Sequence, residues 1–284
     1  MDPIIVTGAA LVEAALLDDT LVPPDPPPNL EPGETRDLRQ RMARFSPPET
    51  HSHRRAAVDA AAAELTVYPF AAAARDRSAA ILGATDDARF DAIERLGLAV
   101  PVEVVALALG VPEPDLVGVR HDVRSIAEVI GRQQRSSPAS DHATARLLQR
   151  FGGDTPAGVA TVSLLYQTHD ATAALFGSHL LARRRDEARR SAVAATIRCA
   201  TAATMIGSTA IPRGATVSVD LDSTGFEFGV GPHACPGRAI AERIVAGMLD
   251  AIDAVDFELC VDDVEWQPDG RPRTLPMTRV GERS

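Results

Sequence analysis

The chain has 284 residues, of which 45% are hydrophobic and 24% charged, a composition typical of globular proteins. Its 39 acidic and 29 basic residues give a net charge of −10, which disfavours binding to nucleic acid. All 29 basic residues are arginine, so lysine chemistry such as Schiff-base formation is excluded. Three cysteines do not form a disulfide framework, and no apolar run reaches about 18 residues. We therefore expect a cytoplasmic protein with reduced thiols and no membrane segment.

The first half of the chain predicts mostly helix. Residues 4–17 predict a short strand that runs into a helix, and the prolines at about 22–33 predict an ordered loop. Helical patterns dominate from about residue 34 to residue 200. Gly110 and Pro112 mark the end of an apolar helix at 101–109, and residues 132–142 are polar and turn-prone.

The longest predicted helix begins at Asp154-Thr155-Pro156, where a capping side chain precedes a proline at the first helical position. Its pattern continues to about Arg185, which gives roughly 30 residues and about 45 Å. Such a helix would cross a whole small domain.

Strand signals appear late in the chain. Residues 209–219 contain a turn between two β-prone segments, and an amphipathic helix is predicted after Pro236. The sequence therefore predicts a mainly α fold with a small β component.

Residues 228–237 read Phe-Gly-Val-Gly-Pro-His-Ala-Cys-Pro-Gly. Gly229 and Gly231 permit backbone conformations that other residues avoid. Cys235 precedes the predicted helix start, where free N–H groups and the helix dipole lower the pKa of a thiol. Its sulfur could be a nucleophile, a metal ligand or a buried cysteine beside a cap. A nucleophile needs a histidine base, and His233 is badly placed for that role on an extended loop.

This segment resembles the haem-binding loop of the cytochrome P450 family, FGxGxHxCxG, and matches all six fixed positions, the last of them Gly237. The resemblance implies a haem b cofactor (iron protoporphyrin IX) with Cys235 as the thiolate ligand of the iron. It also implies that Phe228 packs beside the sulfur and that His233 contacts a haem propionate. A thiolate ligand donates electron density to iron and favours O–O cleavage.

Further segments resemble the same family in chain order. His51 and Arg55 lie four residues apart, on one face of a helix, and resemble the pair that binds a haem propionate. Arg198 resembles another propionate-binding arginine, and Glu187 to Arg190 fits the ExxR element. The resemblance implies a truncated cytochrome P450-like fold, with residues 1–284 forming a single haem-thiolate domain.

The middle of the long helix departs from the family pattern Ala/Gly-Gly-x-Asp/Glu-Thr. Aligned on Asp170, this chain has Ala171 where the family has the threonine that supports proton delivery to dioxygen. The polar segment is either a solvated face or a polar distal pocket. In the pocket interpretation, the candidate catalytic residues are Asp170 with Thr168 or Thr172 as proton relay, and His169 or Gln167 as acid or hydrogen-bond donor.

The chain is also shorter than the family pattern. The segment between Gly110 and Thr155 is too short for the usual distal lid, and only residues 221–227 connect the last strand to the cysteine loop. A shortened lid leaves apolar surface that a second subunit could cover, so we expect a homodimer.

Three functions remain open. The first is a haem-thiolate monooxygenase or peroxygenase in specialised metabolism that acts on a small organic molecule, with electrons from a ferredoxin-type partner or with peroxide. The second is haem chemistry without monooxygenation: a peroxygenase, a dehydratase or isomerase, or oxidative coupling. The third is a non-enzymatic accessory protein of P450 type.

Overall fold

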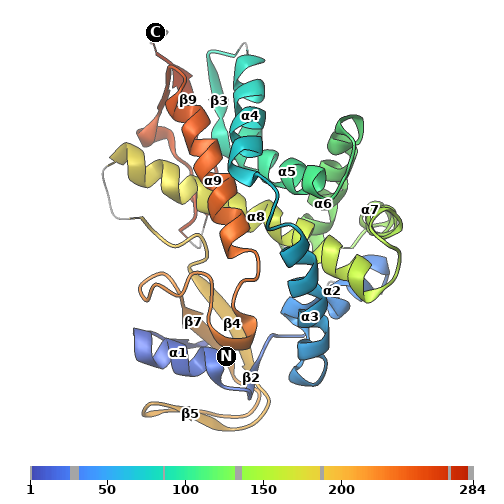
Figure 1. The fold of residues 1–284 in the computed structure, drawn as a ribbon. Helices are drawn as coiled ribbons and strands as arrows, with labels where there is room; N and C mark the ends of the chain where they lie inside the picture. Colours follow the sequence, from blue (N-terminus) through green and yellow to red (C-terminus); the bar gives the residue numbers. More distant parts are fainter. Residues whose placement is uncertain are drawn as a thin grey trace. The chain divides into compact units, whose positions relative to one another are not determined.

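The computed structural model describes residues 2–25, 32–85, 87–131, 136–185, 189–267 and 270–280. They form two compact units (Figure 1). Unit 1 contains residues 1–61, 128–163 and 193–236, and unit 2 contains residues 62–127, 164–192 and 237–284. The expectation of a single domain stays a prediction.

Unit 1 contains most of the strands. Its elements are β1 (Ile4–Val6), α1 (Ala9–Leu17), β2 (Leu21–Val22), α2 (Glu34–Arg41), α7 (Pro138–Arg150), β4 (Ala195–Ala200), β5 (Thr204–Ile206), β6 (Thr209–Ile211) and β7 (Thr216–Asp220). Unit 2 contains α4 (Phe70–Gly83), β3 (Arg89–Asp91), α5 (Val100–Ala108), α9 (Arg238–Asp253), β8 (Phe257–Leu259) and β9 (Pro276–Arg279). Three helices have residues in both units: α3 (Pro48–Glu64), α6 (Leu116–Ile130) and α8 (Pro156–Arg185). The mainly α composition with small sheets is as predicted.

The sheet of unit 1 has the strand order β1-β7-β4-β2. Strand β1 pairs with β7 in parallel, whereas β7 with β4 and β4 with β2 are antiparallel. Val217 and Val219 lie on one face of β7 and pack in a core cluster with Val12 and Leu16 of α1. The predicted strand and helix at 4–17 are therefore confirmed, and alternation along β7 explains why one face is buried.

The β-prone segments at 209–219 are confirmed as β6 and β7, with a turn at Pro212 to Gly214. They do not pair with each other: β6 forms a hairpin with β5, and β7 joins the larger sheet. Strand pairing depends on contacts distant in sequence, which local propensity does not encode.

Helix α7 corrects the expectation of turns through residue 142. Residues 132–135 lie outside the described residues, but a helix begins at Pro138. Ser137 caps it: its side chain accepts the backbone N–H of Ser140 at 3.2 Å, and the Ser140 hydroxyl oxygen accepts the N–H of Ser137 at 3.1 Å. This reciprocal capping box explains why a polar stretch starts a helix.

We expect Ser137→Ala to lower the free energy of unfolding by about 1 kcal/mol, because it leaves a helix N–H without its acceptor. Urea unfolding followed by circular dichroism measures this difference. The control is Ser52→Ala at an exposed position inside α3, which is expected to change stability little. Equal stability of the Ser137 variant and the wild type would contradict the capping role.

Helix α8 has the bounds that the sequence predicted. Thr155 is the cap, since its hydroxyl oxygen accepts the N–H of Gly158 at 3.1 Å. Polar residues interrupt α8 in the middle, and within the described ranges no helix is both long and apolar enough to cross a membrane.

In unit 2, helices α4 and α9 pack against each other at very short range. A Cβ atom added to Gly247 would lie 2.0 Å from the carbonyl oxygen of Ala71, so only glycine permits this approach. The apolar stripe predicted after Pro236 is buried here at Ile244, Met248 and Ile252, as expected. The second sheet of this unit has the order β3-β9-β8.

Candidate functional site

The cysteine loop in unit 1 is closed by its own backbone hydrogen bonds. The N–H of Cys235 donates to the carbonyl of Phe228 at 2.7 Å, and the N–H of Ala234 donates to the carbonyl of Gly231 at 3.0 Å. Gly229 and Gly231 both have φ of +68°, in the left-handed region that L-residues with a side chain rarely adopt. The predicted need for glycine at these two positions is confirmed. The loop therefore has a defined backbone path.

The third glycine of the motif behaves differently. Gly237 has φ of −93° and precedes α9, and a Cβ atom added there would meet nothing within 4 Å. Its backbone therefore does not require glycine, and its cofactor-binding role stays a prediction. Cys235, two residues earlier, is exposed, and Phe228 is half-buried.

Helix α3 brings two of the predicted propionate residues to this loop. His51 is buried, with 7% of its surface exposed, and its ring centroid lies 4.0 Å from that of His233. Arg55, one turn further along, donates from Nη1 to the carbonyls of Pro232 at 2.8 Å and Ala234 at 2.7 Å. The i, i+4 spacing thus directs both side chains to the same loop, as the sequence predicted for one helix face.

Arg198 lies on β4 and is 8% exposed. It donates from Nη1 to the hydroxyl of Thr196 at 3.0 Å and to the carbonyl of Ile197 at 3.2 Å. Burial, together with the positive charge of Arg44, lowers the pKa of Arg198 to about 10. Within the described part of the chain, no carboxylate forms an ion pair with Arg198.

The histidines have the same electrostatic environment. Burial lowers the pKa of His233 to about 4, with further lowering from His51 and from the guanidinium groups of Arg198, Arg55 and Arg44. Burial also lowers the pKa of His51, and the charges of Arg55 and Arg198 add to this effect. Both imidazoles are therefore neutral at pH 7. Cationic groups converge here around hydrogen-bond donors, which is the arrangement of an anion site.

Sequence reasoning missed Arg44 and Asp59. Arg44 contributes positive charge to both His233 and Arg198, and Asp59 accepts a hydrogen bond from Nε of Arg55 at 2.7 Å. Arg44 carries no signal in a chain whose 29 basic residues are all arginine. Asp59 lies four residues after Arg55, so the helical spacing could have indicated that pair.

The polar segment of α8 lies in unit 2. The hydroxyl of Thr168 donates to the carbonyl of Leu164 at 2.8 Å, so it bonds within its own helix. His169 is 1% exposed; its Nδ1 lies 3.1 Å from Oδ1 of Asp170, and its Nε2 has no hydrogen-bond partner among the described residues. Since a carboxylate only accepts, Nδ1 of His169 is the donor in this contact.

Burial along α8 separates the candidate residues into two groups. His169 and Thr172 are buried, and His169 lies on the stripe that contains the fully buried Leu165 and Phe176. Gln167 and Asp170 are only half-buried. A solvated face is therefore wrong for His169 and Thr172, which belong to the packed side of the helix.

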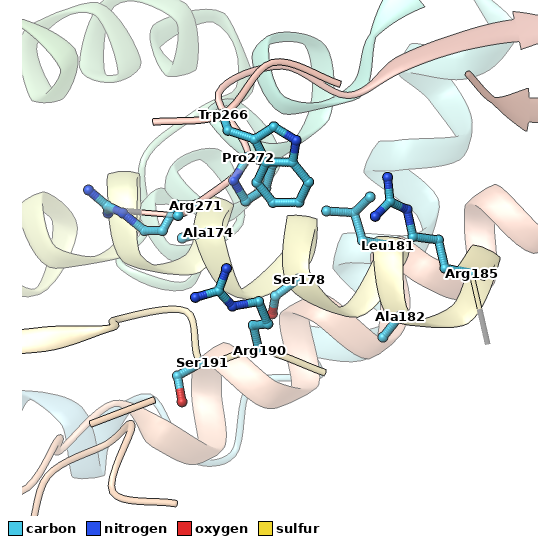
Figure 2. A pocket seen from close by; sticks show the side chains of 11 residues that line it. Ala174, Ser178, Leu181, Ala182, Arg185, Arg190, Ser191, Trp266, Arg271 and Pro272 are labelled. Carbon is cyan, nitrogen blue, oxygen red and sulfur yellow. The ribbon is translucent and has the colours of Figure 1, made fainter. Parts of the chain in front are cut away.

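Beyond this segment, unit 2 contains a small cavity against the C-terminal half of α8 (Figure 2). Ala174, Ser178 and Leu181 of α8 line it together with Trp266 and Arg190. Its volume of about 50 Å³ holds at most a few water molecules, so it cannot take an organic substrate. Glu187 of the predicted ExxR element lies outside the described residues, so a pairing with Arg190 stays a prediction.

Comparison with known proteins gives a fold but no close relative. No protein-family model and no curated protein matches the chain. Among solved structures, P450BioI in complex with an acyl carrier protein ligated to hexadec-9Z-enoic acid has 18% identity and a TM-score of 0.74, over 96% of this chain and 91% of that one. The ligand-free P450 monooxygenase TamI has 20% identity and a TM-score of 0.71, over 96% and 83%.

A mutant of P450 EryK in complex with erythromycin B has 20% identity and a TM-score of 0.68, over 99% of this chain and 92% of that one. Identities of this size establish the fold alone, and the match extends over nearly the whole sequence. The chain therefore has the cytochrome P450 fold.

Proposed function

We propose that the chain binds haem b through Cys235 and is a haem-thiolate oxidoreductase of P450 type that acts on a small organic molecule in specialised metabolism. The observation that carries this proposal is the convergence of His51, His233 and Arg198 beside the cysteine loop. The assignment to specialised metabolism draws support from a similar solved structure described as a P450-like monooxygenase of microbial secondary metabolism.

The residues fit the chemical demands of an iron porphyrin. The group needs a soft anionic axial ligand, which the exposed thiol of Cys235 supplies when ionised. It also carries two propionates that need cationic or N–H partners. Such partners are available from Arg198, His51 and His233. Arg55 can add the Nη2 group of its guanidinium, since the hydrogen bonds to Asp59 and to the loop use its Nε and Nη1 groups. A buried arginine with no carboxylate partner in the described residues is costly unless an anion joins it, which supports a dianionic ligand.

When bound, a thiolate-ligated haem supplies the capacity to activate dioxygen or peroxide. The chain's own contribution to proton movement is assigned to α8. Asp170 holds or releases the proton, and the Nδ1–H of His169 orients its carboxylate. Because the hydroxyl of Thr168 already donates to Leu164, Thr172 is the stronger candidate to replace the missing family threonine. Gln167 remains a candidate hydrogen-bond donor.

Ala171 in place of that threonine favours a second candidate, haem chemistry without monooxygenation. Turnover assays separate the two candidates once a substrate is identified. Product formed with dioxygen, a ferredoxin and its reductase, and absent without them, supports monooxygenation. Product formed with peroxide alone supports a peroxygenase, and product formed without any oxidant supports a dehydratase or isomerase.

The first test of the proposal is titration of the purified haem-free chain with ferric haem, followed by absorption. We expect saturation at about one haem per chain. A linear increase without saturation would indicate nonspecific partition and would favour the accessory protein.

The proposed homodimer has a separate test. Large apolar side chains are exposed at Ile5 and Met205 in unit 1 and at Val67 and Val117 in unit 2. We expect light scattering at micromolar concentration to give twice the mass of 30.0 kDa. A mass of one chain would contradict the dimer without affecting the proposed haem site.

A further inference from the structure

Arg55 already donates hydrogen bonds within the chain, unlike a side chain whose donors are all available to a ligand. Three of its five N–H groups already have partners within unit 1. Nε donates to Asp59 at 2.7 Å, and the two hydrogens of Nη1 donate to the carbonyls of Pro232 at 2.8 Å and Ala234 at 2.7 Å. Both carbonyls belong to the loop that carries Cys235.

The position of these carbonyls in the loop matters for the sulfur. The Ala234 carbonyl belongs to the peptide plane that ends at the nitrogen of Cys235, so fixing this oxygen fixes the plane from which the Cys235 side chain departs. The N–H on the same plane donates to Phe228 at 2.7 Å. The peptide before the cysteine is thus held at its oxygen by Arg55 and at its nitrogen by the loop itself.

Asp59 accepts a hydrogen bond from Nε of the same guanidinium. We call the hydrogen bonds of Arg55 to Asp59 and to the carbonyls of Pro232 and Ala234 the clamp. Asp59 lies one turn along α3 from Arg55, and its carboxylate fixes the guanidinium plane against rotation. As an exposed ion pair it adds little to stability, so its main effect is geometric. Arg55 itself is only 21% exposed in its side chain, which strengthens its bonds to the loop.

We propose that Arg55 is a positioning residue for Cys235: through the carbonyls of Pro232 and Ala234 it holds the loop so that the thiolate is directed before haem binds. This inference rests on the proposed function for its consequence at iron, whereas the hydrogen bonds of Arg55 to Asp59 and to the loop involve only residues of the chain itself. It assigns to Arg55 a role that a propionate contact alone does not include.

The first readout is amide hydrogen exchange of the haem-free protein. Arg55→Met keeps the length of the apolar stem and removes every donor. We expect exchange at Ala234 and Cys235 to accelerate by about ten- to hundredfold, which corresponds to loss of charge-assisted hydrogen bonds to the loop. Asp59→Asn, which leaves both carbonyl bonds, is expected to give a smaller increase. The matched control is Arg75→Met, an exposed arginine of α4 paired with Asp76, which should leave the loop unchanged.

The second readout is the ferrous carbon monoxide spectrum of the haem-loaded proteins. We expect Arg55→Met to lose part of the red-shifted thiolate band, because a misdirected sulfur is more easily protonated or displaced. Arg55→Lys distinguishes the effect of the hydrogen bonds from the effect of the positive charge. Lysine keeps the charge but lacks the planar guanidinium that donates to two carbonyls and Asp59 at once. If the spectrum of the lysine variant resembles that of the methionine variant, the positioning role of Arg55 is supported. If it resembles that of the wild type, the positioning role is overturned.

Two further outcomes overturn the proposal. Unchanged exchange in Arg55→Met would show that the loop holds its own shape, and faster exchange with an unchanged spectrum would show that the clamp does not direct the sulfur. If the wild-type chain takes up no haem, the proposed function fails. The exchange experiment still decides whether Arg55 clamps the loop.

Discussion

The ferrous carbon monoxide complex of the wild-type chain is expected to show a strongly red-shifted Soret band, and Cys235→His is expected to abolish it. A thiolate donates far more electron density to iron than a neutral imidazole does, and this difference shifts the band. Histidine keeps a ligand at the position, so haem can remain bound while its spectrum changes. The measurement is an absorption spectrum of dithionite-reduced protein under carbon monoxide.

The chain offers two matched controls for this experiment. Cys199 and Cys260 are half-buried, and Sγ of Cys260 lies 3.0 Å from the hydroxyl of Thr278. Cys199→Ser and Cys260→Ser are expected to retain the red-shifted band. A band that survives in Cys235→His would exclude Cys235 as the ligand, and a wild-type chain without any haem would make the accessory protein the leading interpretation.

The parts of the fold that the sequence predicted well are those whose signals are local. Helix α8 has the bounds that the Thr155 cap, Pro156 and the helical pattern to about Arg185 indicate, because caps act within one turn and the pattern repeats from turn to turn. The left-handed glycines of the cysteine loop were likewise predictable, since φ is a property of single residues.

Features that depend on tertiary contacts were less predictable. Helix α7 is a separate case, because the Ser137–Ser140 capping box that starts it is a local signal that the sequence analysis missed. Strands β6 and β7 join different sheets, which local propensity does not encode. The burial of His169 is a further example. Its polar neighbours suggested either a solvated face or a pocket, whereas its position on the stripe of Leu165 and Phe176 places it on the packed side.

The candidate site was predicted only in part, because some of its features have local sequence signals and others depend on tertiary contacts. The motif indicated Cys235 and His233, and helical spacing indicated His51 with Arg55. The sequence did not predict that Arg55 already bonds the loop, because hydrogen bonds to backbone carbonyls leave no signature in residue identity.

Arg198→Met is expected to move two measurements in opposite directions. A pKa lowered by burial to about 10 means that folding disfavours the charged guanidinium, at a cost of roughly 3 kcal/mol at pH 7. Methionine keeps the apolar stem, removes this charge and forfeits the hydrogen bonds to Thr196 and Ile197. We therefore expect the haem-free protein to become more stable by about 1–2 kcal/mol in urea unfolding.

The same change is expected to weaken haem binding by about 30- to 5000-fold, because a buried cation that meets an anionic ligand contributes about 2–5 kcal/mol to its affinity. Arg213→Met, at an exposed turn position, should alter neither quantity. The opposite signs are what make the experiment decisive. If Arg198 were purely structural, its replacement would lower the stability of the haem-free protein. If it served neither stability nor ligand binding, its replacement would leave the affinity for haem unchanged. Only a cation retained at the expense of stability for an anionic ligand stabilises the empty chain when it is removed and weakens the complex.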